Sequence, residues 1–405
     1  MKDLDLAGVL ERATADLPVV DRSRESWRRA QHVRRRRTGA AAGAAVVLVV
    51  VGVAGASMWQ RGDGDVRPPI STPTDTPDVA ADAVPVRWDP FTLPDEPRGA
   101  TVLPERLEPP DSAPSVLDAP LPAAVVAWPE EGRDLMLLGT NGDWRTVPGT
   151  ANRDSSSWDE AEPELTADGG RVAISLADGV LVVDVTDGGS ELVPWPDPVS
   201  ETWDGTPALR WLPGETELVV LHWKQTWLMD LDGGFRPAPF GGEYGDGLAI
   251  DPAGPVWDFD YEANEIVRWD GDEVVDRVPG PPWGNRWVAR GDVLAFTGSP
   301  GDRWNHSGPV VLDARTGRVV GAASIKDPSS VYSDNAYLTA QGFLDEETLL
   351  LLVAPMDFDT MEPGDQTWFL AAWDFREGTF ERLTEGDTRM GRIDVATALV
   401  EDGSP

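Results

Sequence analysis

The stretch LVVDVTDGGSELV (181–193) combines a strand pattern, a tight polar turn and a second strand pattern, and this arrangement recurs along the chain. Five more units share it: LMLLGTNGDWRTV (135–147), LMDLDGGFRPAP (228–239), IVRWDGDEVVDRV (266–278), VVLDARTGRVVGAA (310–323) and LAAWDFREGTFERLT (370–384). Their turns begin near Thr140, Thr186, Leu231, Asp270, Arg315 and Arg376. A repeat of about 45 residues with several strands per unit is typical of a β-propeller.

Each unit after the first is preceded by two more strand patterns joined by a short turn, as in PELTADGGRVAIS (163–175). This makes four strands per unit. The first unit, from AVVAW (124–128) onward, lacks an inner strand, whereas RIDVATALV (392–400) resembles an inner strand without a blade after it. The sequence therefore predicts an all-β, six-bladed β-propeller over residues 121–401, closed by its C-terminal strand, which would remove the last exposed sheet edge.

The charge of the chain is distributed unevenly. The chain has a formal charge of −36; residues 1–38 carry a net +4 and the remainder a net −40. Such a negative field repels phosphate backbones, so we do not expect the large domain to bind nucleic acid. The chain has no cysteine, which excludes disulfides and thiolate chemistry.

An uncharged stretch near the N-terminus predicts a membrane anchor. Between Arg37 and Arg61 lie 23 residues without a charge, enough for a transmembrane helix over 38–60. The arginines at 34–37 favour a cytoplasmic N-terminus and an extracytoplasmic propeller in the cell membrane. The alternative is a signal peptide, cleaved near Ala56, that would leave a secreted protein.

Two further segments flank this span. Residues 1–37 predict a cytoplasmic head of one or two short helices with an apolar stripe, formed by Leu6, Val9, Leu10, Ala13 and Leu17. Residues 61–120 predict a Pro-rich linker with extended conformations. The second half of that linker has apolar residues that favour contact with the propeller.

Parts of the chain resemble known propeller repeats. GLAIDPAGPVWDFDYEANEIVRWDG (247–271) resembles an NHL-type repeat, with Asp251, Gly254, Asn264 and Ile266 in the matching places. LTADGGRVAIS (165–175) resembles the repeat of TolB-like propellers. With its anchor and Pro-rich segment, the whole chain resembles actinobacterial membrane-anchored, WD-like propeller proteins of unassigned role. The head resembles the short cytoplasmic heads of actinobacterial membrane-anchored regulators, although it has His32 but no Cys for the zinc sites that many anti-sigma heads carry. These resemblances imply a fold and leave the activity open.

The expected connections differ in length between the two faces of the propeller. The connections after the first and third strands are tight, whereas many connections after the second and fourth strands are long. Long loops on one face of a rigid scaffold commonly form a binding surface. The long connections hold aromatic and acidic residues that suit sugars or cationic peptides. We take as candidate ligand-binding residues Trp158, Trp203, Asp204, Tyr244, Trp283, Trp304, His306, Asp357 and Asp359. Packing between blades is the alternative role for each tryptophan.

No catalytic or cofactor motif stands out. The sequence lacks a GxSxG motif and a phosphate-binding loop. We expect no cofactor; the alternative is Ca²⁺ held by Asp357, Asp359 and Glu362. The sequence thus favours a non-enzymatic extracytoplasmic binding or sensing module whose partner is a protein, peptide or glycan. Two alternatives stay open: a propeller hydrolase or lyase acting on a sugar or lactone, and a membrane signalling partner regulated by its cytoplasmic head.

Overall fold

The structure is a computed structural model in which the described residues all belong to one compact unit, 75–405. It describes residues 86–88, 96, 98–130, 132–151, 163–196, 207–222, 225–241, 247–252, 254–260, 262–280, 285–298, 308–325, 338–353, 356–357, 362–363, 367–386 and 393–400. The predicted head (1–37) and membrane span (38–60) lie outside these ranges. In the described ranges, no helix is long and apolar enough to cross a membrane.

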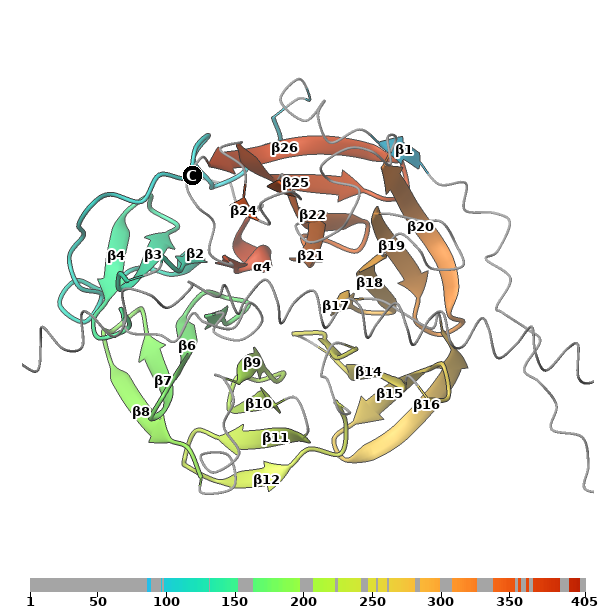
Figure 1. The fold of residues 1–405 in the computed structure, drawn as a ribbon, viewed down its shortest axis with the longest axis horizontal. Coiled ribbons are helices and arrows are strands. Elements are labelled where there is room, and N and C mark those ends of the chain that lie inside the picture. Colours follow the sequence, from blue (N-terminus) through green and yellow to red (C-terminus); the bar gives the residue numbers. More distant parts are fainter. Residues whose placement is uncertain are drawn as a thin grey trace, which may run out of the picture. The chain divides into compact units, whose positions relative to one another are not determined.

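Six antiparallel sheets, here called blades, follow one another around a ring (Figure 1). From the axis outward, blade one contains β27 (Asp394–Val395), β2 (Ala124–Trp128), β3 (Leu135–Gly139) and β4 (Trp144–Val147). Blade two contains β5 (Glu164–Leu165), β6 (Arg171–Leu176), β7 (Gly179–Asp184) and β8 (Ser190–Pro194). Blade three contains β9 (Ala208–Trp211), β10 (Glu217–His222), β11 (Gln225–Asp230) and β12 (Phe235–Pro237).

The second half of the ring repeats this order. Blade four contains β13 (Ala249–Ile250), β14 (Val256–Asp260), β15 (Glu265–Asp270) and β16 (Glu273–Pro279). Blade five contains β17 (Asn285–Arg290), β18 (Val293–Gly298), β19 (Gly308–Asp313) and β20 (Arg318–Ile325), with β1 (Val86–Trp88) as a fifth, outer strand. Blade six contains β21 (Leu338–Phe343), β22 (Thr348–Val353), β25 (Trp368–Asp374) and β26 (Thr379–Gly386). The predicted six-bladed β-propeller is therefore confirmed.

The turn between the third and fourth strands is the same device in every blade. It holds one glycine with a left-handed backbone, at a φ between 56° and 90°: Gly142, Gly188, Gly233, Gly271, Gly317 and Gly378. Four third strands end in an aspartate whose carboxylate accepts hydrogen bonds from backbone N–H groups of the turn: Asp184, Asp230, Asp313 and Asp374. Because glycine adopts this backbone at little cost and aspartate caps the turn, short local sequences fix each hairpin.

The C-terminal segment closes the ring as predicted. Val395 pairs with Val126 and Asp394 with Ala127, so β27 becomes the inner strand of blade one. The predicted strand over 392–400 is shorter than expected, because residues Thr397–Val400 form the helical turn α4 instead. This turn carries Val400 into the core between blades six and one, where Val400 is fully buried.

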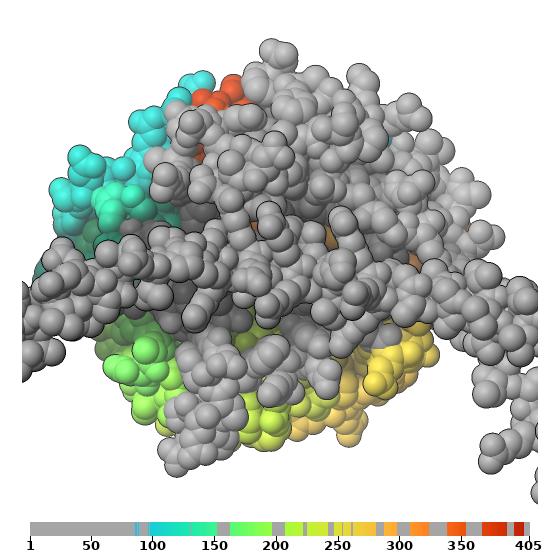
Figure 2. Space-filling model, viewed as in Figure 1, coloured from blue at the N-terminus to red at the C-terminus, as the bar shows by residue number. Residues whose placement is uncertain are grey.

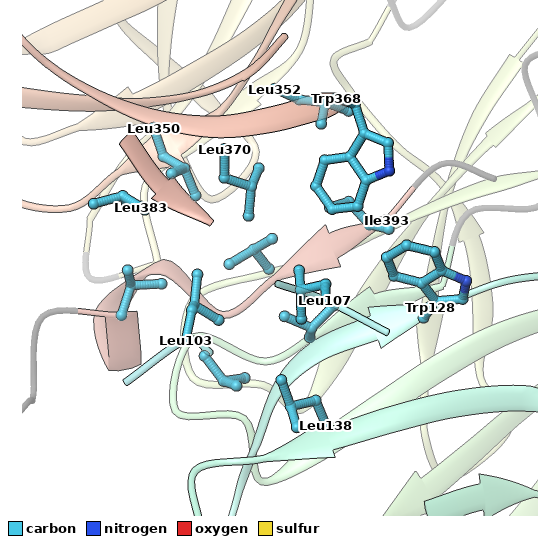
Figure 3. Packing of buried hydrophobic residues seen from close by; sticks show 14 of the residues in the cluster. Leu103, Leu107, Trp128, Leu138, Leu350, Leu352, Trp368, Leu370, Leu383 and Ile393 are labelled. Carbon is cyan, nitrogen blue, oxygen red and sulfur yellow. The ribbon is translucent and has the colours of Figure 1, made fainter. Parts of the chain in front are cut away.

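Buried side chains from neighbouring blades fill the seams between sheets. At the seam of blades six and one, the indole rings of Trp128 and Trp368 lie 5.4 Å apart between centroids. Figure 3 shows this pair beside Ile393. At the seam of blades four and five, Trp287 stacks between Phe259 and Phe296. Tryptophans of the described strands thus pack between blades, the role that the sequence offered as an alternative to ligand contact.

The chain before blade one runs along the outer strands of blades five, six and one and then reaches blade two, and we call residues 86–88 and 98–121 the strap. β1 pairs in parallel with Ala323–Ile325 on blade five. Further along, the N–H of Gly99 donates to the Arg382 carbonyl of blade six at 3.0 Å, and the N–H of Val116 donates to the Thr146 carbonyl of blade one at 2.9 Å. The N–H of Leu121 then donates to the Val185 carbonyl of blade two. Figure 2 shows strap residues in cyan at the surface beside blade one.

Apolar side chains anchor the strap. The ring of Trp88 stacks on Phe380 at 4.3 Å between centroids. Leu103 and Leu107 are buried among leucines of blades one and six (Figure 3). The strap therefore contributes to the core of the propeller. For Leu103 and Leu107 this agrees with the contact expected from the second half of the predicted linker, whereas the packing of Trp88 in its first half was not expected.

We expect Leu107→Ala to lower the free energy of unfolding by about 2–5 kcal/mol, because it leaves a cavity at a fully buried position. Leu117→Ala is the matched control in the same segment, since Leu117 is 38% exposed; its effect should stay below about 0.5 kcal/mol. Urea unfolding followed by tryptophan fluorescence measures both. Equal, small effects of the two substitutions would show that the strap does not belong to the cooperative core.

Candidate functional site

The two faces of the propeller differ in their connections. The turns after first and third strands open on one face, and their longest described examples are 166–170, 185–189, 212–216 and 251–255. The opposite face, which we call the long-loop face, holds every long connection between blade strands: 148–163, 195–207, 238–248, 299–307, 326–337 and 354–367. The predicted asymmetry of the two faces is therefore present in the strand boundaries.

The nine candidate residues from the sequence all fall within connections of the long-loop face. Trp158, Trp203, Asp204, Tyr244, Trp283, Trp304, His306 and Asp359 lie outside the described residues. Asp357 lies in the short strand β23 (Met356–Asp357), which pairs with β24 (Glu362–Pro363), but its side chain also lies outside the description. The contacts of these residues with a ligand or with one another stay predictions.

The structure brings together three charged residues from the inner strands of blades one to three, which we call the channel-mouth residues: Glu164, Arg210 and Asp394. The Arg210 guanidinium forms an ion pair with the Glu164 carboxylate at 3.0 Å. Asp394 Oδ2 accepts a hydrogen bond from the N–H of Leu165. Glu164 and Asp394 are the first residues of strands that begin at the long-loop face, so these groups stand where the channel opens on that face.

Two of the channel-mouth residues, Asp394 and Arg210, satisfy backbone groups on the inner edges of the ring. The N–H of Thr166 donates to the Arg171 carbonyl on the neighbouring strand β6, so the N–H of Leu165 points the other way, into the channel. Asp394 accepts from that N–H. In blade three, Arg210 donates to the Leu209 carbonyl at 2.7 Å. Because unpaired backbone groups are costly when water is excluded, this role explains the charged residues at positions 210 and 394, and Glu164 pairs with the charge of Arg210.

Sequence reasoning missed the channel-mouth residues. They lie on strands as short as two residues, and no motif marks them. The available signal was a charged residue at the start of an inner strand, as in PEL (163–165) and RID (392–394). Because they belong to inner strands, they extend the candidate site from the long-loop face toward the axis.

A further carboxylate supports the base of a long connection. Asp258 of β14 accepts a hydrogen bond from the N–H of Gly241 at 2.9 Å, at the point where the chain enters residues 242–246 with Tyr244. Burial raises the pKa of the Asp258 carboxyl above its ordinary value of 3.8, and the negative charge of Asp260 adds to this effect. The hydrogen bond from Gly241 and the positive charge of Arg277 act in the opposite direction.

No group in the described part of the chain is arranged like a metal centre, since nowhere there do three His, Asp or Glu side chains gather closely enough to hold an ion. The Ca²⁺ ligands suggested from the sequence, Asp357, Asp359 and Glu362, have side chains outside that part.

Comparison with known proteins gives little beyond the architecture. No family model and no curated protein matches the chain. Among solved structures, the chain is similar to one in a nidogen–laminin complex (12% identity, 67% of this chain and 98% of that chain, TM-score 0.43). It is also similar to a putative TolB from Agrobacterium tumefaciens (12%, 65% and 88%, 0.41) and to regucalcin, a calcium-binding protein from the same organism (15%, 56% and 74%, 0.34). At these values the likeness supports no inference about ligand, metal or activity.

The raised pKa of Asp258 predicts a pH dependence of stability. The folded protein holds this proton more tightly than the unfolded chain, so the stabilisation is complete below pH 3.8 and is lost as the pH rises through the folded pKa. Asp258→Asn keeps an acceptor for the N–H of Gly241 and should remove the part of the decrease in unfolding free energy with rising pH that comes from this carboxyl. Urea unfolding between pH 3.5 and about 7 would measure the difference. Asp232→Asn, at an exposed turn, controls for the loss of one negative charge. Parallel stability curves for Asp258→Asn and the wild type would contradict the assignment.

Proposed function

We propose that this chain is a non-enzymatic binding module whose ligand docks on the long-loop face of the propeller. The observation that carries the proposal is the asymmetry of the ring: its long connections between strands all open on one face, above a scaffold closed by β27 and held by the strap. A rigid frame with variable loops on one rim is the usual construction of a recognition surface.

The residues of this face favour a glycan or a cationic peptide as the ligand. Its connections contain tryptophan, tyrosine and aspartate in close succession, as in ETWDGT (201–206) and EYGD (243–246). Aromatic faces stack on sugars and attract cations, and carboxylates hydrogen-bond to hydroxyl or ammonium groups. The Glu164–Arg210 pair and Asp394 add charged groups at the channel mouth.

Binding can be tested with the full chain against a panel of cell-wall glycans and basic peptides. We expect a ligand to change tryptophan fluorescence, and the double substitution Trp203→Ala/Trp304→Ala to weaken its binding at least about tenfold, as loss of aromatic anchors commonly does. Arg315→Ala, in a turn on the opposite face, is the control and should bind as the wild type does. Equal loss in both variants, or no response to any member of the panel, would contradict the proposal.

We also propose that the propeller is held outside the cell by the span 38–60, with residues 1–37 in the cytoplasm. The supporting features are the uncharged stretch and the arginines that precede it. Because the chain has no cysteine, single-cysteine variants report topology cleanly.

In intact cells, a membrane-impermeant maleimide should label Ser112→Cys, at an exposed position of the strap. Ser23→Cys should react only after the membrane is permeabilised. Labelling of Ser23→Cys alone in intact cells would reverse the orientation. Recovery of the chain from the medium, without residues 1–56 by mass, would instead support cleavage and secretion.

A further inference from the structure

The seam between blades six and one contains a pocket of about 230 Å³. It lies at the turn end of blade six, on the sheet face that points toward blade one, where the strap and α4 cover the sheet. Its lining comes from blade six, the strap and α4: Ala100, Leu344, Thr348, Ala372, Asp374, Thr379, Glu381, Leu383 and Val400.

The pocket has an apolar floor and a polar edge. Leu344, Ala372, Leu383 and Val400 form the floor, and all four belong to the buried core of this seam. Thr348, Asp374 and Thr379 form one row across the sheet, because Asp374 pairs with both threonines on the neighbouring strands. A ligand in the pocket therefore meets hydrocarbon on one side and oxygen atoms on the other.

Two carboxylates face the same pocket from adjacent strands. Asp374 uses Oδ1 to accept hydrogen bonds from the N–H groups of Arg376 at 2.9 Å and Glu377 at 2.8 Å. Glu381 lies one cross-strand step away, opposite Ala372, and its Oε2 is so close to the strap that a Cβ at Gly99 would lie 2.7 Å from it. Within the described part of the chain, neither carboxylate forms an ion pair. Both carboxylates therefore line the pocket without a direct ion pair among the described residues, and the Arg98 guanidinium lies beside the pocket, where its Nε donates to the Leu383 carbonyl at 3.5 Å.

We propose that this pocket binds an aliphatic cation, an ammonium or guanidinium group on a short hydrocarbon stem. The two carboxylates and the Thr379 hydroxyl suit the cationic head, and the leucine and valine side chains suit the stem. The volume is below the roughly 300–1,000 Å³ of sites for drug-sized ligands, so the ligand is the size of one basic side chain or a small free amine. The pocket lies at the opposite end of the strands from the long-loop face, so this inference does not depend on the proposed function.

Ligand-observed NMR on the full chain tests the proposal with three probes: n-butylammonium, N-acetyl-arginine amide and neutral n-butanol. We expect the two cations to bind at one saturable site and n-butanol not to bind. Preference for N-acetyl-arginine amide would indicate the side chain of a partner, and preference for n-butylammonium a free amine. Glu381→Gln should weaken cation binding about twofold to fivefold, because Glu381 is exposed and an exposed ion pair contributes up to about 1 kcal/mol.

Two further variants separate the pocket from the general negative field of the protein. Ala100→Leu fills the pocket without changing charge and should abolish binding. Glu377→Gln removes an exposed charge from the same turn but not from the pocket, and it should bind like the wild type. Thermal melting of each variant confirms that it is folded. The proposal is overturned if the cations do not saturate, if Glu377→Gln weakens binding as much as Glu381→Gln, or if folded Ala100→Leu still binds.

Discussion

Main-chain pairing at the seam of blades six and one holds this propeller together. A ring of sheets has two ends that must meet, and here β27 from the C-terminus becomes the inner strand of the blade that begins the ring. The strap crosses the same seam on the outside, where the N–H of Leu107 donates to the Glu385 carbonyl at 2.8 Å. The strap and the C-terminal turn α4 meet there as well, since the N–H of Val102 donates to the Val400 carbonyl. Because β27 closes the ring on its inner side and the strap on its outer side, the long loops can differ in length and sequence without opening the ring.

The outer edges of the blades are protected in two ways. The strap pairs with β20, β26 and β4, so the edges of blades five, six and one are partly covered. The other three outer strands, β8, β12 and β16, each end in a proline: Pro194, Pro237 and Pro279. Proline has no N–H to offer to another strand, so it limits pairing at an edge. Exposed apolar side chains such as Leu192 and Val275 lie on these proline-ended strands, where protection from aggregation matters most.

Sequence reasoning succeeded where the structural signal was local. The six turns are readable because a left-handed glycine and a capping aspartate act within a few residues of each other. Closure was also predictable, because a first blade without an inner strand and a final strand without a blade must complement each other. By contrast, β1 could not be predicted from local sequence. It pairs in parallel with residues more than two hundred positions later, and a strand of three residues is too short to show a periodic pattern. The α4 turn was missed because its sequence suits a strand, and burial of Val400 against the strap decided otherwise.

For the candidate site, loop lengths in the sequence identified the long-loop face, since length follows directly from the spacing of strands. The residues that meet at the channel mouth were not identifiable, because Glu164, Arg210 and Asp394 come from three blades, and Asp394 reaches blade two only when the ring closes. The pocket beside α4 has the same origin, with walls from the strap, blade six and the C-terminus. The sequence by itself determined the repeat, the number of blades and the face with the long loops, because these depend on contacts between near neighbours in the chain. Only the tertiary structure decided which charged side chains face the axis and where a cavity remains, because those depend on contacts between distant segments.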